Sequence, residues 1–393
     1  MQKVMIFHHV GGMGGGSISM IEMARQLQKK YEVVAVIPKE NSETLTAKLS
    51  QYARVIHIDG TFPQFAYYSG SQGIISRTFI KTFFVGKDYS AKILEIAKNE
   101  QPDIIIANSV VELRIGKILS GIATKKILYI RETFIENFIS KKMIKFIGKY
   151  FDAVLCISPY EKEYAKFKIP CEVVADCEYK SENKDFKKED STDFNVLYLG
   201  GIPELKGART LLRAVKYVDP CVRFVLAGRF DYMPPTLLNR IVHRHTLRYQ
   251  KEVRELIQKA GDRIECLGFV NDIASVIKNA DVIAVPFSKA HQSRAVIEAA
   301  EYEKPVIISD FKQLHAYCIN GYNCLSFDSE KPSELAKCIE HLRKNKDISK
   351  KLVENNKKMN EQYHNVEKEK QKLLSFLENI FAFKHYFSYN KIN

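Results

Sequence analysis

The chain has 393 residues, of which 46% are hydrophobic and 27% charged, and its formal net charge is +14. This length predicts two domains, and the composition predicts globular domains with sizeable cores. No apolar run approaches the roughly 20 residues of a membrane-spanning helix, and the chain starts in an apolar strand pattern without a signal-peptide layout. The eight cysteines are scattered without a CxxC pair, so we expect a reduced, cytoplasmic setting.

The excess of positive charge suggests an anionic partner. Nucleic acid, an anionic membrane surface and phosphorylated substrates are the candidates, and a merely basic surface is the alternative. The sequence has no zinc-ligand spacing, no RNP-type aromatic strand and no recognisable helix-turn-helix, so nucleic acid is not an expected partner. His243 and His245 stand in a basic stretch without nearby carboxylates or cysteines, so a metal site is not expected there.

Short apolar runs alternate with amphipathic helical stretches through most of the chain. This rhythm is typical of parallel sheets covered by helices on both faces. In the first half the expected strands are Val4–Phe7, Val33–Ile37, Val55–Ile58, Asp103–Ala107, Ile127–Ile130 and Val154–Ile157. In the second half they are Val196–Leu199, Phe224–Ala227, Ile264–Leu267, Val282–Val285, Val306–Ile308 and Leu325–Phe327. The sequence therefore predicts an α/β protein with two doubly wound, Rossmann-like domains.

A polar, heavily charged stretch from Cys177 to Phe194 separates the two halves and is interpreted as the interdomain linker. The expected domains are residues 1–180 and 190–365. After Asn345 the pattern becomes helical and charged. A terminal helix over about 366–393 has one apolar face, which must dock, and the first domain is a candidate surface for it. This face consists of Leu373, Leu374, Leu377, Ile380 and Phe381.

The first expected strand runs into HHVGGMGGGS and then a helical stretch. Glycines between a strand and a helix let backbone amides approach a ligand, and the helix N-terminus favours a phosphate. The loop is neither a Walker A loop nor a strict GxGxxG, and a glycine loop also serves simply to turn the chain. Its place at the carboxyl end of the first strand favours a binding role. The glycines are Gly11, Gly12, Gly14, Gly15 and Gly16.

The second domain opens with NVLYLGGIPELKGARTLLRAV, in which Gly200 and Gly201 end a strand. Lys206 and Arg209 then stand where they can pair with a diphosphate, or they are simply solvated loop charges. Later, in PFSKAHQSRAVIEAAEYEKPVIISD, Glu298 lies in the first turns of a helix that follows a strand. A carboxylate there can accept both hydroxyls of a ribose. The alternative is a solvated surface glutamate.

The order of these motifs resembles family 4 of the GT-B glycosyltransferases. The glycine loop is followed by G-x-x-x-x-x-K-G, then by S-R-x-V-I-E-A-x-x-x-x-K-P-V-I, and then by NGYNCLSF. The resemblance covers nearly the whole chain and is strongest from Val196 to Ala336. It implies the GT-B fold, in which two Rossmann-like domains face a central cleft.

The resemblance also implies roles for individual residues. Lys206 matches the lysine that contacts the donor diphosphate, and Glu298 matches the second glutamate of the E-x7-E motif, which holds the nucleotide ribose. Gly14, Gly15 and Gly16 match the loop near the donor phosphate and the acceptor. A loop of lesser functional weight is matched by Asn320, Gly321 and Asn323.

The chain departs from the family pattern at several positions. Gly201 stands where the family has an arginine, which Arg209 replaces only in part. Ala290 stands where the first glutamate of E-x7-E faces the donor sugar. We expect His291 and its neighbours Gln292 and Ser293 to supply polar contacts there, and Arg294 to bind phosphate.

The first domain departs from the pattern as well. Arg131 and Glu132 replace the usual histidine near the fifth strand, and the usual NG turn before the linker is absent. His8 and His9 end the first strand, where one of them is a candidate to face the cleft.

The activity implied by the resemblance is retaining transfer from a UDP- or GDP-sugar, without an essential metal, to a glycan or lipid-linked acceptor in bacterial cell-surface polysaccharide or glycolipid synthesis. Lys206, assisted by Arg209 or Arg294, would stabilise the leaving diphosphate. A catalytically impaired protein that binds nucleotide-sugar or acts as a scaffold is the alternative. A nucleotide-sugar epimerase is a third reading, for which no dedicated acid/base set is found.

Two basic, apolar segments of the first domain suggest the inner face of the cell membrane as a location. NFISKKMIKFIGKYF contains four lysines, and Phe146 or Ile147 is a candidate for insertion into the lipid. GIISRTFIKTFFVGK contains Arg77, Lys81 and Lys87. The alternative is a helix packed on its own sheet with its lysines in water. The four lysines are Lys141, Lys142, Lys145 and Lys149.

Overall fold

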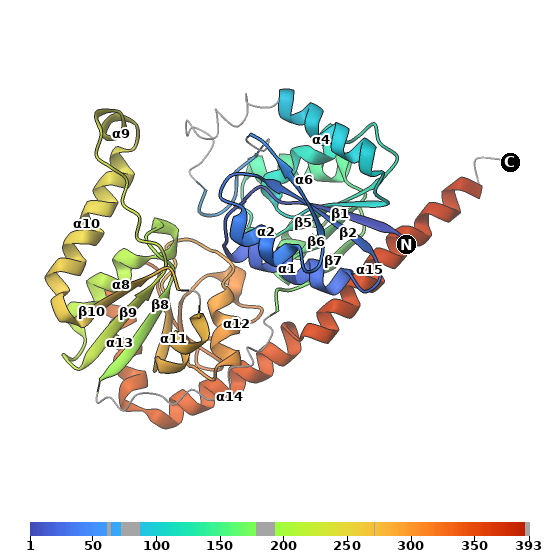
Figure 1. Ribbon diagram of the computed structural model, residues 1–393. Helices are drawn as coiled ribbons and strands as arrows, with labels where there is room; N and C mark the ends of the chain where they lie inside the picture. Colours follow the sequence, from blue (N-terminus) through green and yellow to red (C-terminus); the bar gives the residue numbers. More distant parts are fainter. Residues whose placement is uncertain (61–63, 72–86, 178–192, 271, 390–393) are drawn as a thin grey trace. The chain divides into compact units, whose positions relative to one another are not determined.

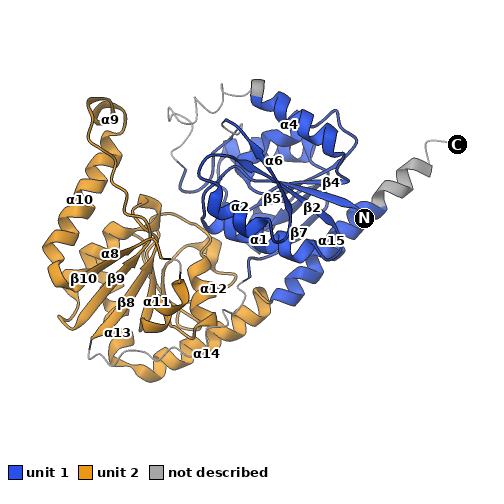
Figure 2. Cartoon of the chain, viewed as in Figure 1, with its two compact units in different colours: residues 1–177, 366–393 blue, residues 178–365 orange. Residues whose placement is uncertain are grey.

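The computed structural model describes residues 1–60, 64–71, 87–177, 193–270 and 272–389, without the side chains of 87–88 and 383–389. The chain divides into two compact units (Figure 2). Unit 1 comprises residues 1–177 and 366–393, and unit 2 comprises residues 178–365. Most of the predicted linker, residues 178–192, lies outside the described residues.

Unit 1 contains a seven-stranded, fully parallel sheet in the order β3-β2-β1-β4-β5-β6-β7. Figure 1 shows this sheet with helices such as α1 and α4 around it. The strands are β1 Lys3–Phe7, β2 Glu32–Pro38, β3 Arg54–Ile58, β4 Ile104–Ala107, β5 Lys125–Ile130, β6 Ala153–Cys156 and β7 Cys171–Val173. The helices are α1 Gly15–Leu27, α2 Glu43–Leu49, α4 Lys87–Glu100, α5 Arg114–Ile118, α6 Phe138–Tyr150, α7 Pro159–Ala165 and α15 Val366–Tyr389, with the 3-10 turn η1 Val110–Glu112.

Unit 2 contains a six-stranded, fully parallel sheet in the order β10-β9-β8-β11-β12-β13. The strands are β8 Phe194–Leu199, β9 Val222–Ala227, β10 Ile264–Gly268, β11 Val282–Val285, β12 Val306–Ser309 and β13 Leu325–Phe327. The helices are α8 Ala208–Ala214, α9 Leu237–Val242, α10 Arg244–Ala260, α11 Ile273–Asn279, α12 Arg294–Glu301, α13 Pro332–Lys344 and α14 Lys346–Tyr363. The 3-10 turns are η2 Glu204–Lys206, η3 Val215–Tyr217, η4 Gly261–Arg263 and η5 Lys312–Leu314.

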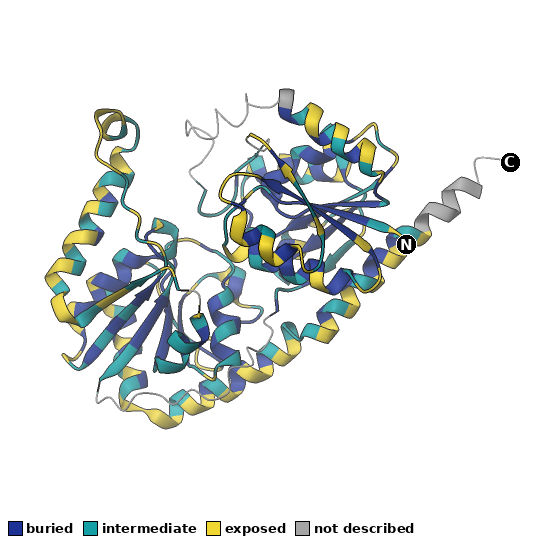
Figure 3. Cartoon of the chain, in the orientation of Figure 1, coloured by how far each residue is buried: buried dark blue, intermediate teal, exposed yellow. Residues whose placement is uncertain are grey.

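The strands are apolar because both faces of each sheet are covered. In β1, Val4 and Ile6 point into one buried cluster, while Met5 and Phe7 point into the cluster on the opposite face. Figure 3 shows the strands mostly buried and the outer helix faces exposed. Every predicted strand is present, within a few residues at its ends. The sequence prediction missed β7, since this strand has only three residues and all of them are half-buried.

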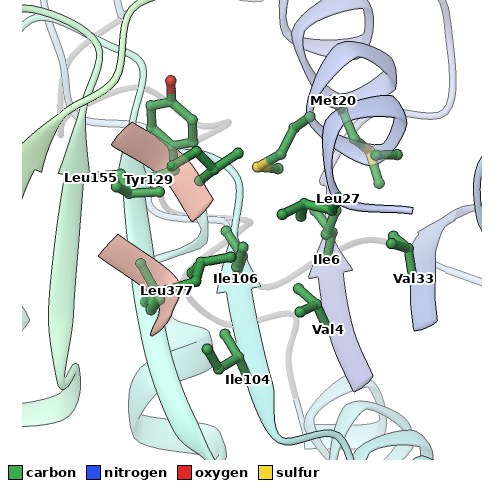
Figure 4. Packing of buried hydrophobic residues seen from close by; sticks show 14 of the residues in the cluster. Val4, Ile6, Met20, Leu27, Val33, Ile104, Ile106, Tyr129, Leu155 and Leu377 are labelled. Atoms are coloured by element: carbon green, nitrogen blue, oxygen red, sulfur yellow. The ribbon is translucent and has the colours of Figure 1, made fainter. Parts of the chain in front are cut away.

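The terminal helix α15 belongs to unit 1. Leu373, Leu377 and Ile380 are almost fully buried in the same cluster as Ile104 and Ile106 (Figure 4). Polar contacts accompany this packing: the buried carboxylate of Glu369 accepts a hydrogen bond of 2.7 Å from the backbone N–H of Ala175. The apolar face recognised in the sequence thus completes the core of unit 1.

Both sheets reverse their strand order next to their first strand, between β1 and β4 in unit 1 and between β8 and β11 in unit 2. Ligands of doubly wound proteins bind at the carboxyl ends of the strands at such a reversal. The loops that follow these four strands are therefore the places to examine. No helix among the described residues is long and apolar enough to cross a membrane.

Candidate functional site

In unit 2 the loop after β8 lies directly on the loop after β11. Gly207 has φ +80°, and a Cβ built there would lie 1.6 Å from the carbonyl oxygen of Pro286. The backbone N–H of Ser288 donates to the carbonyl of Leu205 at 3.0 Å, and the Ser288 hydroxyl donates to the carbonyl of Glu204 at 3.0 Å. The glycine after Lys206 is therefore required for the two loops to approach so closely.

The Gly200–Gly201 turn packs against the loop that follows β9. Gly201 has φ +64°, and a Cβ there would lie 2.5 Å from the carbonyl oxygen of Arg229. The N–H of Ile202 donates to that carbonyl at 2.9 Å. In this conformation an arginine at position 201 would collide with the backbone, which gives a physical reason for the departure from the family pattern. Arg229 itself, in the loop after β9, is an exposed cation next to this turn.

Lys206 lies beside the first residues of the loop after β11. Its Nζ is 4.8 Å from the centre of the Phe287 ring, and the ring of His291 packs edge-on against Phe287 at 5.3 Å. Burial lowers the pKa of Lys206 to about 8, and the charge of Glu298 opposes that shift. Burial, with a further contribution from Lys206, holds the pKa of His291 well below its ordinary value. The site thus pairs a lysine with a neutral imidazole.

Helix α12 brings further predicted residues to this cluster. Arg294 is its first residue and Glu298 lies one turn later, so both are on the same helix face, and both are half-buried. Ala290, the position of the missing glutamate, is 6% exposed. We call Lys206, Phe287, His291 and Glu298 the donor cluster. The sequence analysis did not identify Phe287, although a residue directly after a buried strand is the usual place for such a contact.

Arg209 is surrounded by acids. It lies 3.4 Å from Glu204, 3.8 Å from Glu252 and 3.3 Å from Glu330, and its guanidinium is 5.4 Å from the Tyr249 ring centre. A phosphate-binding role for Arg209 would require it to exchange these carboxylates for phosphate oxygens. Lys206 would not need to exchange partners in this way, because no carboxylate is hydrogen-bonded to it within the described part of the chain.

The NGYN loop holds its own backbone together. The fully buried side chain of Asn323 accepts from the N–H of Ile319 at 2.7 Å and donates to the carbonyl of Tyr317 at 2.8 Å. Asn320 accepts from the N–H of Ser326, and Gly321 has φ +73°. These side chains stabilise the turn before β13.

The glycine loop of unit 1 runs from the end of β1 into α1. Gly14 is the N-cap of α1 in an extended conformation, with no atom within 4 Å of a Cβ built there. At Gly16 a Cβ would touch the His8 ring at 3.3 Å, and at Gly11 it would collide with the carbonyl of Glu40 at 2.2 Å. Of the predicted glycines, Gly14 thus has free space around it at the start of α1, whereas Gly11 and Gly16 are closely packed against other residues.

Behind this loop a buried polar chain crosses the strand reversal of unit 1. The Arg131 guanidinium donates through Nε to Asn108 Oδ1 and through Nη1 to Asp176, both at 2.8 Å. The Asn108 amide in turn donates to His8 Nδ1 at 3.2 Å, and His8 Nε2 lies 3.3 Å from the Ser17 hydroxyl. Burial above all holds the pKa of His8 well below its ordinary value. Arg131 is therefore hydrogen-bonded within the interior of unit 1. Its partners Asn108 and Asp176 were not singled out from the sequence.

One buried and one half-buried carboxyl group lie next to this chain. Glu132 accepts from the Ser109 hydroxyl and from the N–H of Val110, yet burial raises its pKa. Burial, reinforced by Glu132, raises the pKa of Glu112 well above its ordinary value. His9, half-buried beside His8, has a pKa lowered to about 4 by burial.

The lysine-rich segment forms α6. Lys141, Lys142, Lys145 and Lys149 are all exposed. The prediction that Ile147 inserts into lipid is wrong, because this side chain is fully buried in the core of unit 1, and Phe146 packs against that core and against Tyr150. Arg77 and Lys81 lie outside the described residues, and the side chain of Lys87 is not described.

Across the part of the chain that the structure describes, no three His, Cys, Asp or Glu side chains are grouped as a metal site would need. His245 of the pair His243 and His245 lies 3.4 Å from Glu204.

Comparison with known proteins bears on both units. Residues 180–359 match the family described as glycosyl transferases group 1. An uncharacterized glycosyltransferase of Methanocaldococcus jannaschii is 24% identical over 236 residues, which are 57% of this chain and 61% of that protein. The match therefore spans about three fifths of the relative's length.

Solved structures resemble almost the whole chain. HepE of Anabaena, crystallised with UDP and glucose, has a TM-score of 0.76 at 18% identity, covering 96% of this chain and 100% of that one. Sucrose-phosphate synthase from Thermosynechococcus elongatus has a TM-score of 0.73 at 17% identity, with 97% and 100% covered. TarM of S. aureus, crystallised with Fondaparinux, alpha-GlcNAc-glycerol and UDP, has a TM-score of 0.71 at 12% identity, with 96% and 99% covered. These likenesses show that the fold is GT-B, as predicted.

Proposed function

We propose that the chain is a retaining glycosyltransferase that uses a nucleotide-sugar donor, since residues 180–359 match the family described as glycosyl transferases group 1. The observation that carries this proposal is the donor cluster at the strand reversal of unit 2. It combines a lysine with a lowered pKa, a neutral histidine and a carboxylate on the adjoining helix. We assign the donor diphosphate to Lys206 and the nucleotide ribose to Glu298.

The electrostatics of Lys206 suit a diphosphate. A lysine whose pKa is lowered by burial lacks full compensation for its positive charge. An incoming diphosphate supplies that compensation, and the same ammonium then stabilises the negative charge that grows on the leaving phosphate oxygen. Arg294, on the same face of α12 as Glu298, is proposed as an assisting cation because of this position, and Arg209 is the second candidate.

In the proposed reaction the bond between the anomeric carbon and the phosphate oxygen breaks, and a bond from the acceptor hydroxyl oxygen to that carbon forms on the same face of the sugar. The hydroxyl proton passes to the departing phosphate oxygen, so the products are the glycoside and the nucleoside diphosphate. The protein's contribution is to position both reactants and to stabilise the leaving group. No protein base and no essential metal enter this scheme.

The donor is proposed to be a UDP- or GDP-sugar. UDP-glucose and UDP are the ligands named for HepE, which supports UDP as the first nucleotide to test. We propose a glycan or lipid-linked acceptor in cell-surface polysaccharide or glycolipid synthesis, at the inner face of the cell membrane. The exposed lysines of α6 are compatible with an anionic surface there.

The donor assignment is tested by calorimetry with UDP and GDP. Lys206→Ala and Glu298→Ala should each weaken binding of the preferred nucleotide by roughly 1–3 kcal/mol, the usual cost of losing a charged hydrogen bond. Lys312→Ala, which removes an exposed lysine on η5 of the same unit, serves as the control. Unchanged affinity in both site variants would refute the assignment.

A second function is favoured by Ala290 and Gly201, which remove a sugar contact and a phosphate cation from the family pattern. It is a protein that binds nucleotide-sugar without efficient turnover, acting as a binding or scaffold subunit. Donor-hydrolysis assays with UDP-, GDP- and ADP-sugars separate the two. Hydrolysis that disappears in Lys206→Ala supports the enzyme, whereas tight binding without hydrolysis supports the subunit.

A further inference from the structure

Unit 2 presents an exposed apolar tip on the insertion between β9 and β10. Short helix α9 and the start of α10 form this insertion, which extends beyond the sheet in Figure 1. Leu237 is 78% exposed, Leu238 67% and Ile241 71%. These positions follow an i, i+1, i+4 pattern, so they share one side of α9. We call these three side chains the α9 tip.

The tip is bordered by cations. From Pro234 to Lys251 the chain contains three arginines and one lysine, and neither aspartate nor glutamate. All four cations are exposed. Three of them form no ion pair within the part of the chain that is described, whereas Lys251 pairs with Glu255. Arg244 and Arg248 are in α10 at a spacing of four, on one helix face. The four are Arg240, Arg244, Arg248 and Lys251.

The base of the insertion is well anchored, so the exposed tip is not simply a poorly packed loop. Tyr249 and Val253 of α10 are buried in the core of unit 2. The Arg254 guanidinium stacks 4.2 Å from the Tyr232 ring centre, and the Gln250 side chain accepts from the N–H of Met233 at 2.8 Å. Thr236 caps α9 by accepting from the N–H of Asn239.

We infer that the α9 tip and its bordering arginines dock unit 2 onto an anionic membrane surface. Apolar side chains that enter the interface, next to cations that face lipid phosphates, are the two attractions that hold such elements on a bilayer. Nucleic acid would satisfy the arginines but offers little to the exposed leucines and isoleucine. A symmetric contact with a second copy would bring two basic tips together. The membrane is therefore the partner that both features fit.

The insertion follows the carboxyl end of β9, and the donor cluster lies at the carboxyl ends of the strands of the same sheet. His245 of α10 lies 3.4 Å from Glu204, which precedes Lys206 by two residues. If the proposed function holds, docking there would bring the donor cluster near lipid-linked acceptors. Vesicle binding itself does not depend on the transferase activity, so the two proposals can fail separately.

The first test is co-sedimentation of the full chain with vesicles of phosphatidylcholine alone or mixed with phosphatidylglycerol. Replacing Arg240, Arg244 and Arg248 by Gln should lower anionic-vesicle affinity roughly a hundredfold, since each cation near the surface contributes about a fivefold factor. Replacing Leu237, Leu238 and Ile241 by Ser should abolish the salt-resistant part of binding. The matched control replaces the exposed Lys346, Lys350 and Lys351 of α14 by Gln.

The second test uses the absence of tryptophan from the chain. Leu238→Trp places a single fluorophore on the tip, and Phe138→Trp places one on α6, where Phe138 is 67% exposed. Anionic vesicles should shift the emission of Leu238→Trp to the blue, whether or not they also shift that of Phe138→Trp.

The inference is overturned if wild type ignores anionic vesicles at low salt, if the α14 control loses as much affinity as the arginine variant, or if the emission shift occurs at Phe138→Trp alone. Binding to polyglutamate with no vesicle binding would assign the surface to an acidic protein instead. Unchanged circular dichroism of each variant verifies that it is folded.

Discussion

The strand reversals of the two units have the same topology, but their charged side chains differ in burial and in pairing. In unit 1 the Arg131 side chain is 6% exposed and bonded to Asn108 and Asp176, which continue into His8. In unit 2 the Arg209 side chain is 25% exposed among glutamates that are themselves partly exposed. Lys206 nearby has a pKa lowered to about 8.

This difference separates charges that stabilise the fold from the lysine to which we assign the donor diphosphate. The buried chain of unit 1 satisfies its own donors and acceptors, so its removal should cost stability. The lysine of unit 2 is incompletely compensated, so its removal should cost binding. Each prediction below tests one side of this contrast.

The largest effect is expected for Arg131→Met. This change removes the guanidinium that bonds to the buried Asn108 and to the half-buried Asp176, and breaking a buried pair from one side typically costs about 3–5 kcal/mol. Urea unfolding followed by circular dichroism, with hydrogen exchange to locate the loss in unit 1, measures it. Arg209→Met is the matched control, because a partly exposed pair contributes only about 0–1 kcal/mol. Equal losses in the two variants would contradict the contrast.

A second large effect is expected at Gly207. In Gly207→Ala the methyl group meets the Pro286 carbonyl and φ is +80°, so the loops of the donor cluster must move apart. Backbone strain alone costs about 1–3 kcal/mol, and nucleotide affinity should fall with it. Gly14→Ala is the control in unit 1, since its backbone is extended and the space around it is open. Thermal unfolding should show the loss of stability for Gly207→Ala and little change for Gly14→Ala, and calorimetry should show the loss of nucleotide affinity for Gly207→Ala.

The sequence predicted the fold well because fully buried parallel strands are apolar runs separated by helical periodicity. Strands such as Ile104–Ala107 and Val282–Val285 have every residue buried, so the pattern had no competing interpretation. The short β7 escaped because Cys171–Val173 is half-buried and contains a glutamate. A three-residue edge strand is recognised only through its neighbour β6.

Residues of the candidate site could be predicted only where they lie together in one stretch of the sequence. Lys206 comes from the motif after β8, and His291 and Glu298 come from the motif that runs from the loop after β11 into α12. The acids around Arg209 come from three separate elements, η2, α10 and the turn before α13, and no local pattern could reveal them. The collision that excludes a side chain at Gly201 likewise depends on the Arg229 backbone. Tertiary contacts, and not residue type, decide these roles.

The third prediction concerns pH. If Lys206 binds the diphosphate as the ammonium, a bound nucleotide raises its pKa, and binding takes up a proton once the pH exceeds the free value of about 8. Affinity should therefore be constant below that pH and fall by up to about tenfold per unit above it. Lys206→Arg should flatten this dependence, because guanidinium stays charged. Calorimetry from pH 7 to 9.5 in buffers of different ionisation enthalpy provides the measurement, and a slope shared by both proteins would rule Lys206 out as its source.

The smallest effect, and the finest test, is Ala290→Glu. Ala290 is 6% exposed and lies next to His291 in the loop of the donor cluster. A carboxylate introduced there loses hydration, so it should reduce stability slightly unless a ligand hydroxyl donates to it. If the position faces the donor sugar, affinity for UDP-glucose should change more than affinity for UDP, by about one hydrogen bond, or roughly 0.5–1.5 kcal/mol. Ala290→Gln supplies the same bulk without the charge and separates a hydrogen bond from electrostatic repulsion of the diphosphate. If both ligands respond equally to both substitutions, position 290 does not face the sugar, and the loss of the family's glutamate does not account for the choice of donor.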